Sequence, residues 1–337
     1  MRFHPKKLSQ QVIVITGASS GIGLALARSA ARRGARTVLA GRNAATLERL
    51  ADELRTQGGR AVAVQADVAQ PSDVANIAET AIRHFGQFDT WVNNAGVSIF
   101  GNIDGIPMED YRRLFDTNFW GVVHGSLEAV KHLEARGGCL INIGSEVSDR
   151  AIPLQGMYSA SKHAVKGFTD ALRMELEARK APISVTLVKP ASIATAFTRN
   201  AGNYMDVEPT LPPPVYSPQA VADAILFAAE HPRRDIYVGS ASRAIAAGAH
   251  YMPRLMDRIM EAMLLRQQRS SRPARHNDSG ALYQPGLQLE ESPPMDRTVR
   301  RRSFYTLATT SVRPALWLAA GTLLAYGALH RRRAGRS

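Results

Sequence analysis

The chain has 337 residues, of which 45% are hydrophobic and 21% charged, an ordinary globular composition long enough for one large domain or two small ones. Its one cysteine, Cys139, excludes an intramolecular disulfide and favours a reducing, cytoplasmic compartment. The formal net charge of +13 comes mostly from residues 243–337, which hold 16 arginines and six acidic residues, so the basic character belongs to the C-terminal part rather than to the chain as a whole.

Short apolar runs alternate with longer amphipathic segments from residue 12 to about residue 190. Strands are expected at 12–16, 36–40, 61–65, 90–94, 139–144 and 184–188, with a seventh candidate at 235–239. Helices are expected at 22–33, 44–56, 72–85, 109–134, 157–180 and 218–230. Strands that are apolar on both faces and separated by helices predict a parallel sheet covered on both sides. The expected fold is therefore a Rossmann-type, doubly wound α/β fold with a nucleotide site at the carboxyl ends of the strands.

A glycine-rich stretch, "TGASSGIG" (16–23), connects the first expected strand to the first expected helix. Gly17, Gly21 and Gly23 let the backbone turn tightly and bring its amides close to a pyrophosphate at the N-terminus of a helix. The spacing differs from G-x-G-x-x-G. Its position after the first strand of a βαβ series nevertheless favours a nucleotide site.

The second expected strand ends in "LAGRN", where Gly41 stands at the place of a possible carboxylate and Arg42 follows. An acid at such a position binds a ribose 2′-hydroxyl, whereas an arginine binds a 2′-phosphate. The next acid is Glu48. This favours NADP over NAD, and the alternative is that Arg42 only caps a surface turn.

The stretch "YSASK" places Tyr158 and Lys162 four residues apart, on one face of the expected helix 157–180. A cation beside a phenol favours the phenolate, so the tyrosine pKa is expected to fall. Such a phenol can exchange a proton with an alcohol or an alkoxide. An amphipathic helix with a surface lysine is the alternative.

Taken together, these stretches resemble the short-chain dehydrogenase/reductase family in its Tyr-x-x-x-Lys branch. The resemblance covers about residues 10–240 and rests on "TGASSGIG", "NNAG" (93–96), Asn118 in "DTNFWG", Ser145 in "INIGS", and "YSASK". It implies that Tyr158 is the general acid/base and that Lys162 lowers its pKa and holds the nicotinamide ribose. It implies further that Ser145 binds the substrate oxygen and that Asn118 anchors a water in a proton relay.

The resemblance also implies a set of cofactor contacts and no metal site. These contacts are Gly17, Ser19, Ser20, Gly21, Ile22, Gly23, Arg42, Asp67, Val68, Asn94, Ala95, Gly96, Tyr158, Lys162, Pro190, Ile193 and Thr195. Two positions depart from the family pattern. Ala191 stands where a glycine is usual, and Glu146 follows Ser145, where we expect it to point away or to meet Arg150.

The implied activity is an NADP-dependent transfer of hydride between nicotinamide and a carbonyl or secondary alcohol, with an apolar or lipid-like substrate. The alternative is a catalytically silent dinucleotide sensor or scaffold on the same fold. We also expect a homo-oligomer. The irregular segment 191–217, with "TLPPPVYSP", is expected to form a substrate wall or lid.

The remaining chain is expected to extend the catalytic domain, residues 1–242, in three parts. Residues 243–268 form an amphipathic helix, 269–303 a disordered linker, and 304–337 an apolar segment flanked by arginines. The helix carries an apolar stripe made of Met252, Leu255, Met256, Ile259, Met260, Met263 and Leu264. This stripe either packs on its own domain or a partner subunit, or it forms a wall for an apolar substrate or a membrane-facing surface.

The last apolar run, "ALWLAAGTLLAYGAL" (315–329), is shorter than the roughly 20 residues of a spanning helix. Arginine clusters at 300–302 and 331–333 flank it and would attract anionic lipid. We therefore expect shallow membrane attachment, with an apolar helix docked on the main domain as the alternative. The basic tail lacks interleaved aromatic residues, which speaks against nucleic-acid binding.

Overall fold

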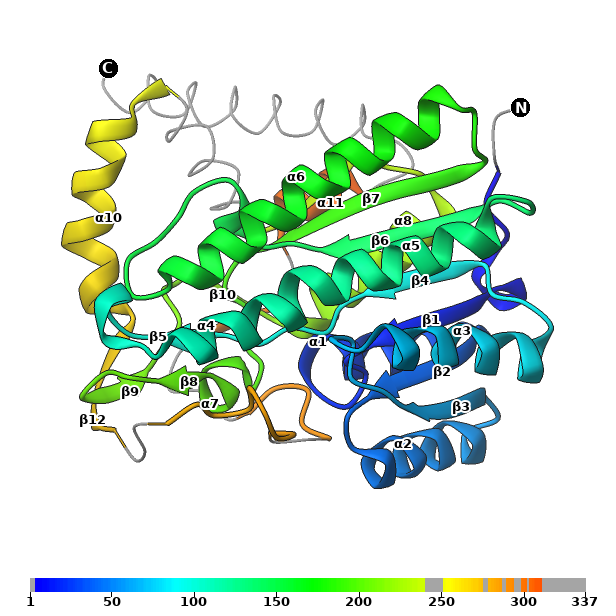
Figure 1. Cartoon of the computed structure of the whole chain (residues 1–337), viewed down its shortest axis with the longest axis horizontal. Coiled ribbons are helices and arrows are strands. Elements are labelled where there is room, and N and C mark those ends of the chain that lie inside the picture. Colours follow the sequence, from blue (N-terminus) through cyan, green and yellow to red (C-terminus); the bar gives the residue numbers. More distant parts are fainter. Residues whose placement is uncertain are drawn as a thin grey trace, which may run out of the picture.

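Seven parallel strands form the central sheet of the computed structural model, which describes residues 4–239, 251–274, 278–286, 289–293, 298–301 and 303–310. Their order is β11-β7-β6-β4-β1-β2-β3 (Figure 1). The strands are β1 (Val12–Thr16), β2 (Arg36–Gly41), β3 (Arg60–Gln65), β4 (Thr90–Asn93), β6 (Gly138–Ile143), β7 (Ile183–Pro190) and β11 (Asp235–Val238). The predicted doubly wound α/β fold is confirmed, and all seven expected strands are present.

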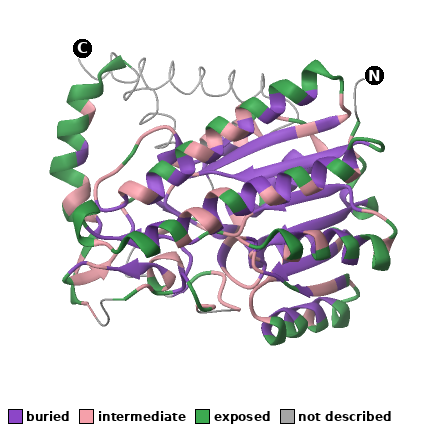
Figure 2. Cartoon of the chain, in the orientation of Figure 1, coloured by how far each residue is buried: buried purple, intermediate pink, exposed green. Residues whose placement is uncertain are grey.

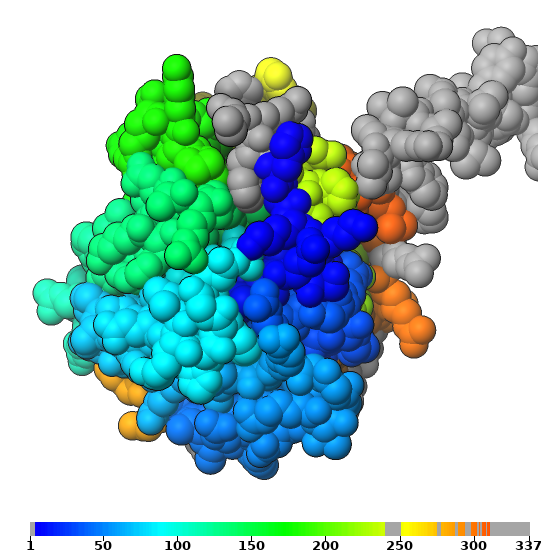
Figure 3. Space-filling model, turned by 90° about the vertical axis from the view of Figure 1, so that its right-hand side faces the viewer, coloured from blue at the N-terminus to red at the C-terminus, as the bar shows by residue number. Residues whose placement is uncertain are grey.

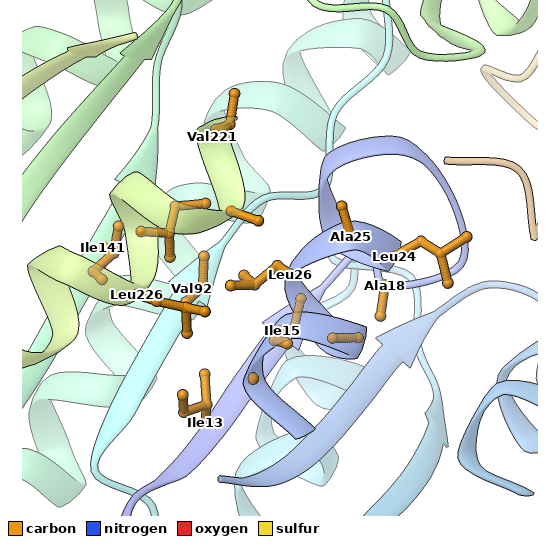
Figure 4. Close-up of a cluster of buried hydrophobic side chains, with 14 of the residues drawn as sticks. Ile13, Ile15, Ala18, Leu24, Ala25, Leu26, Val92, Ile141, Val221 and Leu226 are labelled. Carbon is orange, nitrogen blue, oxygen red and sulfur yellow. The ribbon is translucent and has the colours of Figure 1, made fainter. Parts of the chain in front are cut away.

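Alternate residues of the strands face two different helical layers. Ile13 and Ile15 pack with α1 (Gly21–Arg32), α2 (Ala44–Thr56) and α8 (Pro218–Glu230), in the cluster drawn in Figure 4. Val12 and Val14 pack on the other face with α3 (Pro71–Phe85), α5 (Gly121–Leu133) and α6 (Gly156–Ala178). The strands are consequently buried along most of their length, while the helices keep one exposed side (Figure 2).

The segment expected as one helix at 109–134 is divided into three parts. Helix α4 (Met108–Phe115) leads into a π-helical turn, Asp116–Trp120, and α5 follows. Turns of this kind widen a helix by one residue and are frequent at functional sites. Asn118 lies in the turn and is fully buried.

The two ends of the sheet differ in what surrounds them. The N-terminal segment, with the short helix η1 (Leu8–Gln10), lies near the amino ends of the strands, on the side seen in Figure 3. At the carboxyl ends, two short 3₁₀ helices are present, η2 (Ile103–Gly105) and η4 (Glu146–Ser148). Helix α7 (Phe197–Asn200) lies in the segment after β7.

Parts of the chain after residue 268 pair with the irregular segment that follows β7. Strand β9 (Val207–Pro209) pairs with β12 (Arg269–Pro273), and β10 (Val215–Tyr216) pairs with β13 (Val299–Arg300). Another short pair joins β5 (Ile99–Phe100) to β8 (Gly202–Asn203). The described parts of 269–303 thus differ from the disordered linker that the sequence predicts, because they bind along the substrate-side loops of the main domain.

Helix α10 (Pro253–Gln267) corresponds to the described part of the expected helix 243–268, and residues 240–250 lie outside the described residues. Of its apolar stripe, Met260 is buried, whereas Met252, Leu255, Ile259 and Met263 are among the exposed large hydrophobic side chains. An ion pair between Arg150 and Asp257 ties α10 to the loop before α6. Most of the stripe is therefore available to a partner.

Helix α11 (Phe304–Thr309) docks beside β11, where the Thr306 hydroxyl donates a hydrogen bond to the Tyr237 carbonyl at 3.2 Å. The expected apolar run 315–329 lies outside the described residues. Among the helices that the structure describes, none combines the length and the apolar character needed to cross a membrane.

Candidate active site

Tyr158 and Lys162 lie one turn apart at the start of α6, and both are nearly buried, with exposed fractions of 9% and 5%. The Lys162 ammonium lies 5.8 Å from the centroid of the Tyr158 ring. It donates a hydrogen bond to the carbonyl of Ile143, at the end of β6, at 2.9 Å. This burial is inconsistent with the alternative of a solvated surface lysine, and it places both groups at the carboxyl end of the sheet.

Ser145 and Asn118 reach the same place from other elements. Ser145 precedes η4, and its side chain is hydrogen-bonded to Tyr158. The Asn118 amide holds the backbone of Val97 from both sides, accepting from its N–H at 2.8 Å and donating to its carbonyl at 2.9 Å. Asn118 also donates to the Ser161 hydroxyl at 3.2 Å. The π-helical turn, β6 and α6 therefore bring four sequence-predicted residues together.

The pKa values of the pair differ from what the spacing predicts. Burial raises the pKa of Tyr158 above its usual 10, an effect that the hydrogen bond with Ser145 opposes and the nearby Glu146 carboxylate adds to. Burial also lowers the pKa of Lys162 to about 8. The expected lowering of the tyrosine pKa is thus not found in the structure described, because burial disfavours the charged phenolate.

The glycine-rich turn has the close backbone approach that its sequence predicts. Gly17 and Gly21 have φ angles of +66° and +51°, which L side chains rarely adopt. A Cβ at Gly23 would lie 2.1 Å from the Gly17 carbonyl oxygen, so only glycine fits. The Asn94 amide braces the turn by donating to the carbonyls of Thr16 at 2.9 Å and Gly17 at 3.2 Å. A cradle this close to the N-terminus of α1 fits the pyrophosphate of a dinucleotide.

A cavity of about 200 Å³ extends from this turn to the ends of β2 and β3. Its lining includes most of the sequence-predicted cofactor residues: Gly17, Ser19, Ser20, Gly21, Ile22, Arg42, Asp67, Val68, Asn94, Ala95, Gly96 and Thr195. Gly23 and Asn118 are not among the lining residues, since Gly23 packs beneath the turn and Asn118 behind Gly96.

Arg42 and Asp67 lie at the far end of this cavity, and both already have partners. The Arg42 guanidinium donates to the carbonyls of Ala281, Leu282 and Gln284 at 2.7, 2.8 and 3.1 Å. Asp67 forms an ion pair with Arg113. Arg42 is not a cap of the turn in which it lies, because its partners come from about 240 positions further along the chain.

A second cavity, of about 140 Å³, contains the Tyr158 cluster. Sequence-predicted residues in its lining are Ile22, Asn94, Gly96, Ser145, Tyr158, Lys162, Pro190, Ile193 and Thr195. Five residues are shared with the first cavity, namely Ile22, Asn94, Gly96, Thr195 and Phe197. The two cavities thus meet at the centre of one cleft, and the nicotinamide end of a dinucleotide would reach Tyr158.

The wall of the second cavity is mostly apolar on the side away from the shared residues. Val147, Ile152, Leu211 and Pro212 line it, and Ala191 replaces the usual glycine there. Glu146 also lines this cavity. Arg150, which the sequence suggests as a partner of Glu146, forms an ion pair with Asp257.

Several residues at the site carry no sequence signal. Gln155 lines the second cavity, accepts a hydrogen bond from Ser98 at 3.2 Å and donates one to Gln268 at 2.7 Å. Arg113 reaches Asp67, at the far end of the first cavity, from α4. Ala281, Pro285 and Gly286 line the first cavity although they are far away in the sequence. Only a three-dimensional structure reveals such contacts, since no local pattern predicts them.

The comparisons with known proteins agree with this architecture. Residues 11–205 match the family model described as short chain dehydrogenase. The chain is 50% identical over 307 residues to the uncharacterized oxidoreductase YxnA of Bacillus subtilis (strain 168), which covers 90% of this chain and 86% of that protein.

Two solved structures share the fold at 26% identity. One is a short chain dehydrogenase/reductase from Burkholderia phymatum in complex with NAD, with a TM-score of 0.66 over 79% of this chain and 98% of that one. The other is an alcohol dehydrogenase from the archaeon Thermococcus sibiricus complexed with 5-hydroxy-NADP, with a TM-score of 0.60 over 68% and 95%. The chain belongs to the short-chain dehydrogenase/reductase family of NAD(P)-dependent oxidoreductases.

Proposed function

We propose that the protein is an NADP-dependent oxidoreductase acting on a carbonyl or secondary alcohol of an apolar small molecule. The observation that carries this proposal is the cluster of Ser145 with the buried Tyr158 and Lys162 in the wall of a mostly apolar cavity. The proposed assay measures oxidation of NADPH and reduction of NADP with a panel of ketones and alcohols of graded length. A lack of turnover across the panel by the folded protein would count against the proposal.

The residues of the cluster have separate tasks in the proposed reaction. Nicotinamide, when bound, supplies or accepts the hydride. Tyr158 donates a proton to the substrate oxygen in reduction and removes it in oxidation. Ser145 donates a hydrogen bond to the same oxygen and stabilises negative charge as it develops there. The Tyr158 pKa is high in the described state, so the phenol is protonated and ready for the reductive direction.

Lys162 and Asn118 support this proton path from behind Tyr158. Lys162, with a pKa of about 8, exchanges protons near neutral pH, and we propose that it also holds the nicotinamide ribose. The Asn118 carboxamide oxygen accepts one hydrogen bond from Val97 and has a second lone pair. We propose that it anchors the water that links Lys162 to solvent.

The preference for NADP over NAD rests on Arg42. Its planar fork of donors suits a 2′-phosphate, and Gly41 leaves the ribose side without a carboxylate. The carboxylate that does lie nearby, Asp67, is paired with Arg113. NAD is the less favoured cofactor because its free 2′-hydroxyl would leave the Arg42 charge without an anionic partner.

The intact cluster argues against a catalytically silent sensor or scaffold. Such a protein has no use for a buried lysine beside a buried tyrosine, and burying both groups costs stability. The apolar part of the cavity wall supports an apolar substrate. None of the residues in that wall comes from α10, so the exposed apolar stripe of α10 is better explained by a surface contact than by substrate binding.

We further propose that the C-terminal segment attaches the protein to a membrane and that copies of the chain associate. The sequence of the run 315–329 and its flanking arginines support the first idea. The exposed side chains of Leu255, Ile259 and Met263 on α10 support contact with a partner subunit or with the same membrane. The proposal also divides the chain at about residues 242, 268 and 303, with the described parts of 269–303 packed on the catalytic domain rather than forming a free linker.

A further inference from the structure

A segment from the C-terminal part of the chain lies across the adenosine half of the cleft. We call it the strap and define it as residues 278–286 together with 289–291. Figure 1 shows it as the orange chain at the carboxyl end of the sheet, near α7. Ala281, Pro285 and Gly286 form part of the wall of the cavity that Gly41 and Asp67 also line. The strap therefore borders the part of the cavity that would hold the adenosine side of a bound dinucleotide.

The first part of the strap, 278–286, is hydrogen-bonded to the Arg42 side chain. Its carbonyls at Ala281, Leu282 and Gln284 accept hydrogen bonds from both terminal nitrogens of the guanidinium. Leu282 also accepts from Arg113 at 3.0 Å. These donors are the ones that a 2′-phosphate would require. Carbonyl oxygens that face the guanidinium would repel a phosphate placed beside them.

The second part of the strap, 289–291, is hydrogen-bonded to the backbone of the glycine-rich turn. The Gly21 N–H donates to the Glu290 carbonyl at 3.0 Å, and the Leu289 N–H donates to the Ser19 carbonyl at 2.7 Å. Gly21 is the first residue of α1, where amides bind anions. A backbone amide carries one hydrogen, so Gly21 cannot fully serve the Glu290 carbonyl and a pyrophosphate oxygen together.

Separate anchors hold the two parts in place. The Tyr283 hydroxyl donates to Asp110 at 2.9 Å, and the side chain of Leu282 is fully buried in the cluster that contains Tyr158. In the second part, Glu291 pairs with Arg28 at 2.8 Å and Glu290 with Arg199 at 3.3 Å. The Tyr283, Glu290 and Glu291 side chains do not line the dinucleotide cavity, so they can be changed without altering its wall.

We propose that the strap competes with the dinucleotide and sets the balance between NADP and NAD, an inference that rests on the proposed role of Arg42. Both cofactors must displace the second part from Gly21. Only NADP gains affinity by displacing the first part, because its 2′-phosphate then accepts the Arg42 hydrogen bonds in place of the carbonyls. The first part of the strap is thus a specificity element, and the second part lowers the affinity for both cofactors.

Titration calorimetry with NADP and with NAD tests this division of roles. Tyr283→Phe loosens the first part and is expected to lower the Kd for NADP about three- to tenfold, with the Kd for NAD nearly unchanged. Glu290→Ala with Glu291→Ala loosens the second part and is expected to lower both Kd values by about threefold. The control, Glu134→Ala with Asp223→Ala, removes two comparable surface ion pairs away from the strap and is expected to change neither Kd.

Hydrogen exchange supplies a readout that does not depend on which cofactor is preferred. Saturating dinucleotide is expected to speed exchange at the Leu289 amide, since displacement breaks its bond to Ser19. An unchanged Leu289 amide, or a Tyr283→Phe variant that binds NADP no better than the wild type, overturns the strap proposal. A third result is faster exchange at the Leu289 amide together with an Arg42→Ala variant that binds NADP as well as the wild type does. That result would support competition at Gly21 and would refute both the specificity role of Arg42 and the proposed preference for NADP.

Discussion

The Lys162 ammonium lies 5.8 Å from the centroid of the Tyr158 ring and gives a hydrogen bond to the Ile143 carbonyl at 2.9 Å. This arrangement joins the last residue of β6 to the first turns of α6 through a buried, titratable group. Because burial is the cause of the lowered Lys162 pKa, the same feature that prepares the site for proton transfer also makes folding dependent on pH.

The pH dependence of stability follows from this lysine. Its pKa falls from 10.5 to about 8 on folding, so the unfolded chain binds more protons than the folded one between these values. The free energy of unfolding contributed by Lys162 therefore rises with pH across that window. Urea denaturation from pH 7.5 to 10 is expected to show a steeper rise for the wild type than for Lys162→Met.

Lys166→Met is the control for this measurement, because Lys166 lies one turn further along α6 and is 38% exposed in its side chain. It is expected to keep the wild-type dependence on pH. Equal slopes for the wild type and Lys162→Met would mean that Lys162 keeps its ordinary pKa in the folded protein.

Cofactor preference is tested at the end of β2. Arg42→Ala is expected to lower kcat/KM for NADPH by about 10- to 100-fold, the loss of charge-assisted hydrogen bonds to a phosphate, while kcat/KM for NADH changes little. Gly41→Asp is sterically allowed, since a Cβ there meets its first neighbour at 3.7 Å, and is expected to shift the preference towards NADH. Arg36→Ala, at the other end of the strand, serves as control. Equal use of both cofactors by the wild type would contradict the proposal.

Substitution of two glycines, one in the proposed pyrophosphate cradle and one outside it, tests whether the cradle binds the dinucleotide. Gly23→Ala would place a Cβ 2.1 Å from the Gly17 carbonyl oxygen, so we expect loss of dinucleotide binding and destabilisation by about 1–3 kcal/mol. Gly167→Ala on α6 meets nothing within 4 Å and is expected to leave binding intact and to stabilise by up to about 1 kcal/mol. Calorimetry and thermal denaturation of both variants would reveal the difference. Normal binding by Gly23→Ala would show that the turn adapts.

Membrane attachment is tested by comparing the full chain with a variant that ends at Thr310. The variant keeps α11, whose Thr306 hydroxyl is hydrogen-bonded to Tyr237, so its folded domain stays intact. We expect only the full chain to sediment with vesicles containing anionic lipid and to need detergent for release. Recovery of both proteins in the supernatant at low salt would refute the attachment.

Local sequence patterns predict the sheet and its layers because each strand is recognisable from its own run of apolar residues. Val12–Thr16 is apolar at every position up to Thr16, and the alternation of its side chains between two helical faces follows from strand geometry alone. The spacing of Tyr158 and Lys162 likewise predicts that they share one face of α6. These predictions need only the neighbours of each residue along the chain.

Local patterns do not predict features that depend on contacts between distant parts of the chain. The composition of 269–303 predicts a linker, yet Leu282 is fully buried and its carbonyl binds Arg42 and Arg113. The sign of the Tyr158 pKa shift depends on how much protein surrounds the phenol, which spacing does not encode. The π-helical turn at Asn118 interrupts a continuous helical pattern, and the Asn118 amide is bonded there to Val97, a residue 21 positions away in the sequence.

The central claim is that Tyr158 moves the proton while other residues bind the cofactor, and Tyr158→Phe tests it most directly. The measurement is single-turnover oxidation of NADPH with a substrate from the ketone panel, together with the calorimetric Kd for NADPH. The account predicts a rate lower by about 10²- to 10⁴-fold and a Kd within about twofold of the wild type. A near-normal rate in the phenylalanine variant, with the cofactor bound, would contradict it.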